Sequence, residues 1–199
     1  ALANSFIYAI VTTLVCLLIC SIAGYGFEVY HDKWKDKLFS ILLLAMMIPQ
    51  VATMVPLFQM FSKARLLNCT LGFILPMIST PFMIMMFRQN ARAFPIDIIE
   101  AARIDGLNEV QIFFRMFFPT MKSTYAAAAV ITFMNAWNSY LWPKVIMTDN
   151  DSLTMPMLIA NLITGYVTDY GMLMCGVLFC SIPTMIVFFV LQKQFAEGI

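Results

Sequence analysis

Few residues in this chain have the types and spacing that chemistry requires. Cys16 and Cys20 stand four positions apart, so on a helix both thiols would share one face and could hold a soft metal ion. No His or carboxylate lies in the same uncharged stretch, which makes packing the expected role of the two thiols. The sequence has no P-loop, G-x-S-x-G or H-E-x-x-H motif and a single His. We therefore expect no catalytic residue, no metal site and no cofactor bound by this chain itself.

A second group of candidates lies in the segment 88–122, which holds five cationic and four acidic residues among many Ile and Phe side chains. Connections longer than about 12–15 residues are usually structured or functional. Pro95 suits the first position of a helix and Asp97 suits its first turn. Gly106 suits the left-handed residue that ends a helix. The segment thus predicts a short helix with a sharp stop.

A second helix is expected directly after this stop. Asn108 and Gln111 have the spacing of a capping box. The helix should bury an apolar stripe at helical spacing, and Pro119 should close the run. The predicted stripe consists of Val110, Phe113, Phe114 and Phe117.

The residues alone leave two explanations for this two-helix segment. The helices either lie on a membrane surface as amphipathic connectors or dock onto a partner protein. The first explanation accounts for the Phe stripe. The second accounts better for Ala101 and Ala102, which would let another backbone come close, and for Glu100, whose charge could pair with a cation on the partner. Both explanations stay open at this point.

Composition indicates the environment of the whole chain. Of its 199 residues, 61% are hydrophobic and 12% are charged, whereas soluble domains carry about 25% charged residues. The net charge of +1 provides no basic field that could hold nucleic acid. The chain is therefore expected to be a membrane protein in contact with lipid and without a nucleic-acid partner, and a soluble enzyme and a disordered chain are excluded.

The pattern of uncharged stretches predicts an all-α, polytopic membrane helix bundle in a single domain covering residues 1–199. A spanning helix needs about 20 mostly apolar residues. Five stretches meet this requirement, at about residues 4–27, 38–62, 70–87, 123–143 and 170–191. A shorter stretch at 152–168 is more polar and is expected to be interfacial or re-entrant.

The distribution of Lys and Arg predicts the orientation of the bundle. With five crossings, nine of the twelve cationic residues fall on one side, together with the segment 88–122. The positive-inside rule makes that side cytoplasmic and makes the segment 144–169 an outer segment. The chain starts without Met inside an apolar run, so we expect further sequence upstream of Ala1.

The segment 88–122 resembles the EAA loop of ABC importer permeases. The pattern is Glu100-Ala101-Ala102, three residues, Gly106, nine residues, then Met116, Phe117, Phe118 and Pro119, with Met116 and Phe118 in place of the family's Ile and Leu. Further likeness to the carbohydrate-uptake branch lies in Ile48-Pro49, Pro56-Leu57, Leu66-Leu67-Asn68, Ile104-Asp105-Gly106, the run Phe133 to Pro143, Thr154, Pro156 and Gln192. The chain is similar over essentially its whole length to the small membrane subunit of the maltose transporter and its sugar-importing relatives.

The resemblance implies a function and a set of partners. Members usually carry six spans, so the first would lie upstream. The EAA loop would form a coupling helix on a separate cytoplasmic ATPase dimer, which binds ATP and Mg²⁺. A second homologous permease subunit would complete the path, and an extracytoplasmic solute-binding protein would deliver a sugar or oligosaccharide at the outer segment, across a bacterial inner membrane. The coupling residues implied are Glu100, Ala101, Ala102, Arg103, Asp105 and Gly106.

Polar and aromatic residues within the spans are candidates for the solute path. Sugars are held by amide hydrogen bonds and aromatic faces, but for each polar residue a hydrogen bond to a neighbouring helix is the more common role. The candidates are Gln50, Asn135, Trp137, Asn138 and Tyr140, and the further polar groups within the spans are Thr53, Ser139 and Thr184. Trp142, at the outer end of its span, is assigned to the aromatic belt.

Two other functions compete with the sugar importer. One is the same machine carrying another small solute, such as an amino acid, peptide or polyol phosphate. The other is a membrane scaffold that does not transport, which would need no ATPase and would tolerate Gly106→Ala. A membrane enzyme has the least support because no nucleophile–base pair is present.

Overall fold

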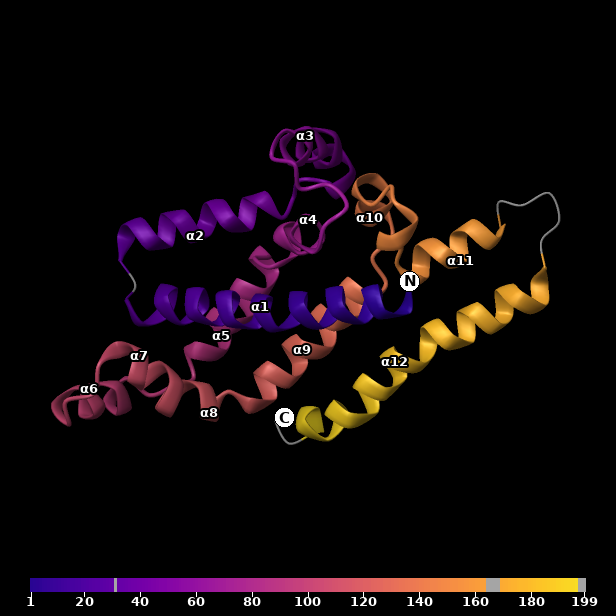
Figure 1. The fold of residues 1–199 in the computed structure, drawn as a ribbon. Helices are drawn as coiled ribbons and strands as arrows, with labels where there is room; N and C mark the ends of the chain where they lie inside the picture. The colour runs from indigo at the N-terminus through magenta and orange to yellow at the C-terminus, as the bar shows by residue number, and fades with distance from the viewer. Residues whose placement is uncertain (31, 164–168, 197–199) are drawn as a thin grey trace.

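The computed structural model describes residues 1–30, 32–163 and 169–196, and within these ranges the chain is helical and contains no strand (Figure 1). The longer helices are α1 (Leu2–Val29), α2 (Lys33–Ala45), α3 (Gln50–Lys63), α5 (Pro81–Ala91), α9 (Lys122–Trp137) and α12 (Tyr170–Ala196). The shorter ones are α4 (Thr70–Ile74), η1 (Leu75–Met77), α6 (Ile96–Ile104), α7 (Glu109–Ile112), η2 (Phe113–Phe117), α8 (Phe118–Thr120), α10 (Leu141–Ile146), η3 (Asn150–Ser152) and α11 (Met155–Ile163). The predicted all-α class is confirmed.

The long helix α1 is the centre of the bundle, and its main contacts are with α5 and α9. One face carries small and polar side chains that pack inward, including Ala9, Cys16 and Cys20, while Leu14 and Leu18 on the opposite face stay exposed. The Sγ atoms of Cys16 and Cys20 lie 3.7 Å apart within this packed face. Such a division is what a helix between protein and lipid requires.

Two of the predicted crossings are broken helices. The stretch 38–62 is divided between α2 and α3, whose axes differ by 103°, and 70–87 is divided at a 50° bend before α5. Pro49 takes an extended conformation as the N-cap of α3, because its ring prevents the helix from continuing from α2. Pro81 likewise opens α5 behind Thr80. Proline therefore determines where the chain turns.

The number of crossings stays a prediction. Among the described residues, α1 and α12 are long and apolar enough to cross a bilayer, and up to four spans result if each bent pair counts as one. The helix in the stretch 123–143 is shorter than predicted, because α9 ends at Trp137 and a separate helix, α10, follows.

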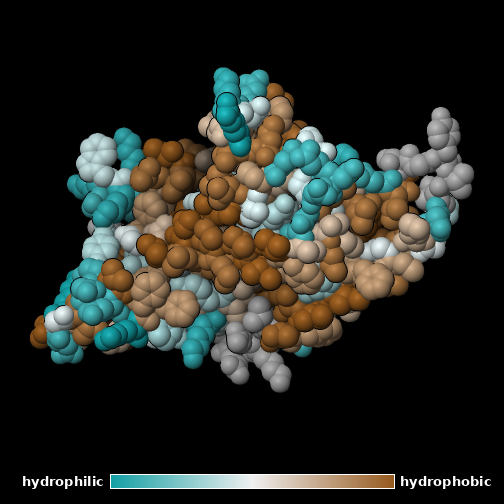
Figure 2. Space-filling view, viewed as in Figure 1, coloured by the Kyte–Doolittle hydropathy of each residue, from teal (hydrophilic) through white to brown (hydrophobic). Residues whose placement is uncertain are grey.

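The two ends of the molecule differ in what they contain. The last turn of α1, the first turn of α2 and the segment α6–α8 lie at one end, and the N-terminus lies with α10 and α11 at the other (Figure 1). Figure 2 shows hydrophobic side chains over the middle of this face and hydrophilic ones gathered at the α6–α7 end and near α3 and α10. The Asn4 amide donates to the carbonyls of Asp151 and Leu153, which ties the start of α1 to the outer segment. Residues 164–168 of that segment lie outside the described residues.

Three apolar clusters follow one another along α1. We call them the outer cluster, around Tyr8, Phe73 and Trp142, the middle cluster, around Cys16, Met83 and Phe87, and the inner cluster, around Tyr25, Ile99 and Phe117. The inner cluster attaches α6 and α7 to the bundle. The segment α6–α8, which we call the coupling segment after the role that its resemblance implies, is thus a packed part of the molecule.

Candidate functional site

The helix α6 and its stop have the geometry that the sequence predicts, with one shift. Pro95, predicted as the first helical residue, is instead the N-cap of α6, so the helix begins one position later than predicted. Gly106 has φ +83°, the left-handed conformation expected of it. The Leu107 amide donates to the Ala102 carbonyl at 3.0 Å and the Gly106 amide to the Arg103 carbonyl at 3.1 Å. Together these bonds form a Schellman motif, which satisfies the last carbonyls of the helix and turns the chain sharply.

Burial divides α6 into two faces. Ile99 and Ala102 are buried in the inner cluster. The opposite face is exposed and consists of Asp97, Glu100, Ala101 and Ile104, which lie at helical spacing. Ile104 is 86% exposed, although it is apolar. Ala102 was expected on the docking face, but its methyl group packs inward, so its role is to let α6 sit close to the bundle.

The second helix confirms the capping box and corrects the apolar stripe. Asn108 and Gln111 exchange hydrogen bonds between side chain and backbone in both directions. The predicted burial of Val110 and Phe114 is wrong, since both are exposed. The cause is the π-helical turn η2, whose wider turn brings residues five apart onto one face. The buried set is therefore Ile112, Phe113, Phe117 and Met121.

An ion pair holds the two helices of the coupling segment together. Arg103 Nε donates to Glu109 Oε1 at 2.8 Å, and the Arg103 guanidinium lies 5.9 Å from the ring centre of Tyr30. The hydrogen bonds from Arg103 and from the Tyr30 hydroxyl hold the pKa of Glu109 below its usual value. The pair is thus complete at neutral pH and is lost only as the pH falls through that lowered value. Among the described residues Glu100 has no such ion pair, so its charge is available to a partner.

A second ionic group at the same end was not predicted. Arg88 is 5% exposed, and its guanidinium donates from Nε to Glu28 Oε2 at 3.1 Å and from Nη2 to Asp36 Oδ1 at 2.6 Å. It also lies over the Phe39 ring. These contacts join α1, α2 and α5. These residues are far apart in sequence, so the sequence does not show that they pair. The feature that could have indicated it is that each charged residue flanks an apolar stretch on the same predicted side of the membrane.

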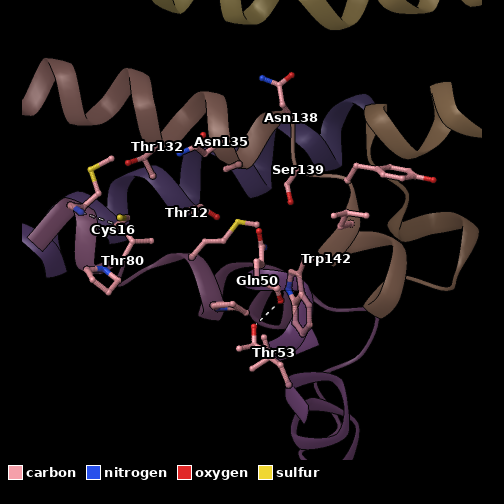
Figure 3. Close-up of a pocket in the computed structure, with 18 residues that line it drawn as sticks. Thr12, Cys16, Gln50, Thr53, Thr80, Thr132, Asn135, Asn138, Ser139 and Trp142 are labelled. Atoms are coloured by element: carbon pink, nitrogen blue, oxygen red, sulfur yellow. Dashed lines mark hydrogen bonds between the residues drawn. The ribbon is translucent and has the colours of Figure 1, made fainter. Parts of the chain in front are cut away.

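A cavity of about 760 Å³ lies between α1, α3, α5, α9 and α10 (Figure 3). Four of the five predicted path residues line it, namely Gln50, Asn135, Asn138 and Tyr140. The Asn138 side chain points away from the other labelled polar groups in Figure 3, and its amide donates to the Met134 carbonyl at 2.9 Å. Gln50 and Asn135 are therefore the predicted amides best placed to meet a solute.

The structure changes the roles expected of two tryptophans. Trp137 is 1% exposed, does not line the cavity, and donates from Nε1 to the Cys180 carbonyl at 2.9 Å. Its assignment to the path is therefore corrected. Trp142, assigned to the aromatic belt, is instead buried, lines the cavity and donates from Nε1 to the Gly72 carbonyl at 3.1 Å. Thr53 and Ser139, the further polar candidates from the sequence, also line the cavity. Sequence reasoning missed the other polar residues of the wall, which are Thr12, Cys16, Thr80 and Thr132.

Comparison with known proteins gives one family and several transport relatives. Residues 17–199 match the family described as binding-protein-dependent transport system inner membrane component. The chain is 44% identical over 195 residues to the lactose transport system permease protein LacG of Rhizobium radiobacter, covering 98% of this chain and 71% of that protein. It is 35% identical to the arabinooligosaccharides transport system permease protein AraQ of Bacillus subtilis, covering 98% and 70%. It is 30% identical to the sn-glycerol-3-phosphate transport system permease protein UgpE of Escherichia coli O1:K1, covering 100% and 71%.

Two solved structures share the fold. A bacterial ABC transporter involved in the import of the acidic polysaccharide alginate superposes with a TM-score of 0.87 at 20% identity, covering 97% of this chain and 73% of that chain. The inward-facing MetNI methionine ABC transporter superposes with a TM-score of 0.71 at 14% identity, covering 98% and 92%. The fold of this chain is thus an architecture found in solved transporters.

Proposed function

We propose that this chain, which belongs to the family of inner membrane components of binding-protein-dependent transport systems, is a permease subunit of an ATP-driven importer for a sugar or oligosaccharide. The sugar is proposed from the lactose and arabinooligosaccharide transport relatives. Importers for other small solutes, such as the glycerol-3-phosphate relative, are the alternative. Family membership speaks against the scaffold that does not transport.

The proposed machine needs further subunits. This chain has no P-loop sequence, so ATP and Mg²⁺ would be bound by a separate cytoplasmic ATPase dimer. A second homologous permease would complete the path through a bacterial inner membrane, which each permease would cross several times. An extracytoplasmic binding protein would release its solute at the outer segment, where Asp149, Asp151 and Asp169 make the surface acidic.

The observation that carries the proposal is the exposed face of α6. A helix of nine residues is too short to be stable alone, and here it is held by the inner cluster, a Schellman motif and the Arg103–Glu109 ion pair. It presents Glu100, Ala101 and Ile104 outward at the end opposite α10 and α11. Such a rigidly mounted face suits a groove on an ATPase subunit. Asp105 and Gly106 would lie at its rim.

The test is co-purification of the ATPase with full-length protein expressed together with the other proposed subunits. Glu100→Lys reverses a charge on the docking face that no ion pair engages among the described residues, so we expect the ATPase to be lost from the purified complex. Asp149→Lys is the matched control, because it makes the same charge change at an exposed residue of the outer segment. We expect this control to retain the ATPase.

Two results would contradict the proposal. If no ATPase accompanies the unchanged protein in any detergent, the segment α6–α8 is an amphipathic connector on the membrane surface. If Glu100→Lys retains both the ATPase and normal uptake, the docking face lies elsewhere.

A further inference from the structure

The polar wall of the cavity includes a threonine of α1 whose side-chain hydroxyl makes no hydrogen bond to the described residues. Thr12 is 0% exposed and lines the cavity, yet its Oγ1 has no hydrogen-bond partner among the described residues. Its neighbour Thr13 shows what a threonine on α1 otherwise does, because Thr13 Oγ1 donates to the Ala9 carbonyl at 2.7 Å. A buried hydroxyl without a partner costs free energy, so a ligand that supplies the partner would be stabilised.

Other polar groups around the cavity can both donate hydrogen bonds to a sugar's hydroxyl groups and accept them. Figure 3 shows Thr12 and Asn135 on one side, with Gln50 and Ser139 nearby. Amide and hydroxyl side chains can each donate and accept, as sugar hydroxyls do.

The cavity wall also lacks charge. Among the described residues that line it there is no Asp, Glu, Lys, Arg or His. A phosphate or carboxylate group that entered would lose water without gaining a cation, and burying an unpaired charge is costly. The wall therefore favours a neutral solute over an anionic one such as a polyol phosphate.

We infer that this cavity binds a neutral, polyhydroxylated solute, and that the Thr12 hydroxyl bonds one of the solute's hydroxyl groups. The inference rests on the proposed import function and narrows its solute class. It adds to the predicted amides a residue of α1, the helix whose inner end packs beneath α6 and α7.

A protection experiment on the complete transporter measures this binding directly. Ser139 lines the cavity and is half-buried, so alkylation of a Ser139→Cys variant, followed at that peptide by mass spectrometry, reports occupancy of the cavity. Lactose and arabinotriose serve as neutral probes and glycerol 3-phosphate as the anionic probe. We expect both sugars, but not glycerol 3-phosphate, to slow alkylation in a concentration-dependent manner.

Three threonine variants in this background test the role of Thr12. Thr12→Val keeps the shape and removes the hydroxyl, so the sugar concentration for half-protection should rise about two- to tenfold, the worth of one hydrogen bond. Thr12→Ser keeps the hydroxyl and should protect like the parent. Thr13→Val, whose threonine does not line the cavity, should also leave protection unchanged and controls for altered packing of α1.

The inference is overturned if glycerol 3-phosphate protects as well as the sugars, if neither sugar protects, or if Thr12→Val protects like the parent. These results are distinguishable from failure of the proposed import function. That failure would appear as absence of the ATPase from the purified unchanged complex, which is verified before alkylation.

Discussion

Gly106 ends α6 with a positive φ for which a side chain is unfavourable. A left-handed residue other than Gly costs about 1–2 kcal/mol. At Gly106 an added Cβ meets nothing within 4 Å, so backbone strain alone would act. We expect Gly106→Ala to leave the complex assembled but to loosen the Schellman motif, lowering the solute taken up per ATP hydrolysed. Uptake and ATPase activity measured together in proteoliposomes check this.

The matched variant at this position is Gly106→Asn. Asn tolerates the left-handed region better than Ala, and its side chain has open space here. Asn should therefore recover most of the coupling that Ala loses. Equal coupling in the Ala variant and the unchanged protein would mean that the sharp end of α6 is dispensable.

Site residues that depend on local sequence could be predicted, and those that depend on tertiary contacts could not. Gly106 and the capping box of Asn108 are consequences of helix-end chemistry within a few residues. The places of Trp137 and Trp142 depend on where α9 ends and on which carbonyls of other helices come near. Thr12 is recognised as a candidate only from the structure, because its buried hydroxyl has no hydrogen-bond partner among the described residues.

At the scale of the elements, the approach of α1 to α5 depends on a missing side chain. A Cβ on Gly24 would lie 2.6 Å from Phe87 Cβ and 2.8 Å from the Arg88 backbone nitrogen. We expect Gly24→Ala to push the helices apart, costing about 1–3 kcal/mol as an overpacking change, and to strain the ion pairs of Arg88 beside it. A lower unfolding temperature of the purified complex is the expected observation.

Gly26 gives the control from the same helix. A Cβ there meets nothing within 4 Å, so Gly26→Ala should be neutral or stabilising by up to about 1 kcal/mol through helix propensity. If both variants shift the unfolding temperature equally, the effect belongs to the helix and not to its contact with α5.

The apolar runs in the sequence predicted where helices form, but they did not predict the direction in which each helix runs. A run of about 20 uncharged residues is compatible with a straight span and with two helices at a large angle, because hydropathy contains no orientation. The 103° angle between α2 and α3 arises at Pro49, and sequence alone does not show whether a proline kinks a helix or starts a new one. The π turn at Phe113–Phe117 likewise changes the buried face without changing the composition.

At the scale of the whole molecule, α1 connects the coupling segment to the cavity. Tyr25 lies in the inner cluster and Thr12 at the cavity wall, and their separation of 13 residues in sequence corresponds to about 20 Å of continuous helix. A displacement of α6 can reach the cavity through this helix only if the inner cluster moves as a unit. The Tyr25 ring links α1 to the rest of the inner cluster. Its centre lies 5.4 Å from the ring centre of Phe113 and 4.8 Å from that of Phe117.

Tyr25→Leu should therefore separate docking from transmission. Each lost aromatic contact is worth about 1 kcal/mol, while the exposed face of α6 stays intact, so we expect the ATPase to remain bound and hydrolyse ATP while uptake per ATP falls several-fold. Tyr8→Leu is the control, since Tyr8 stacks on Phe73 at 4.7 Å in the outer cluster of the same helix and should lower the unfolding temperature without changing that ratio. Equal ratios in both variants would show that movement of α6 reaches the cavity by another route.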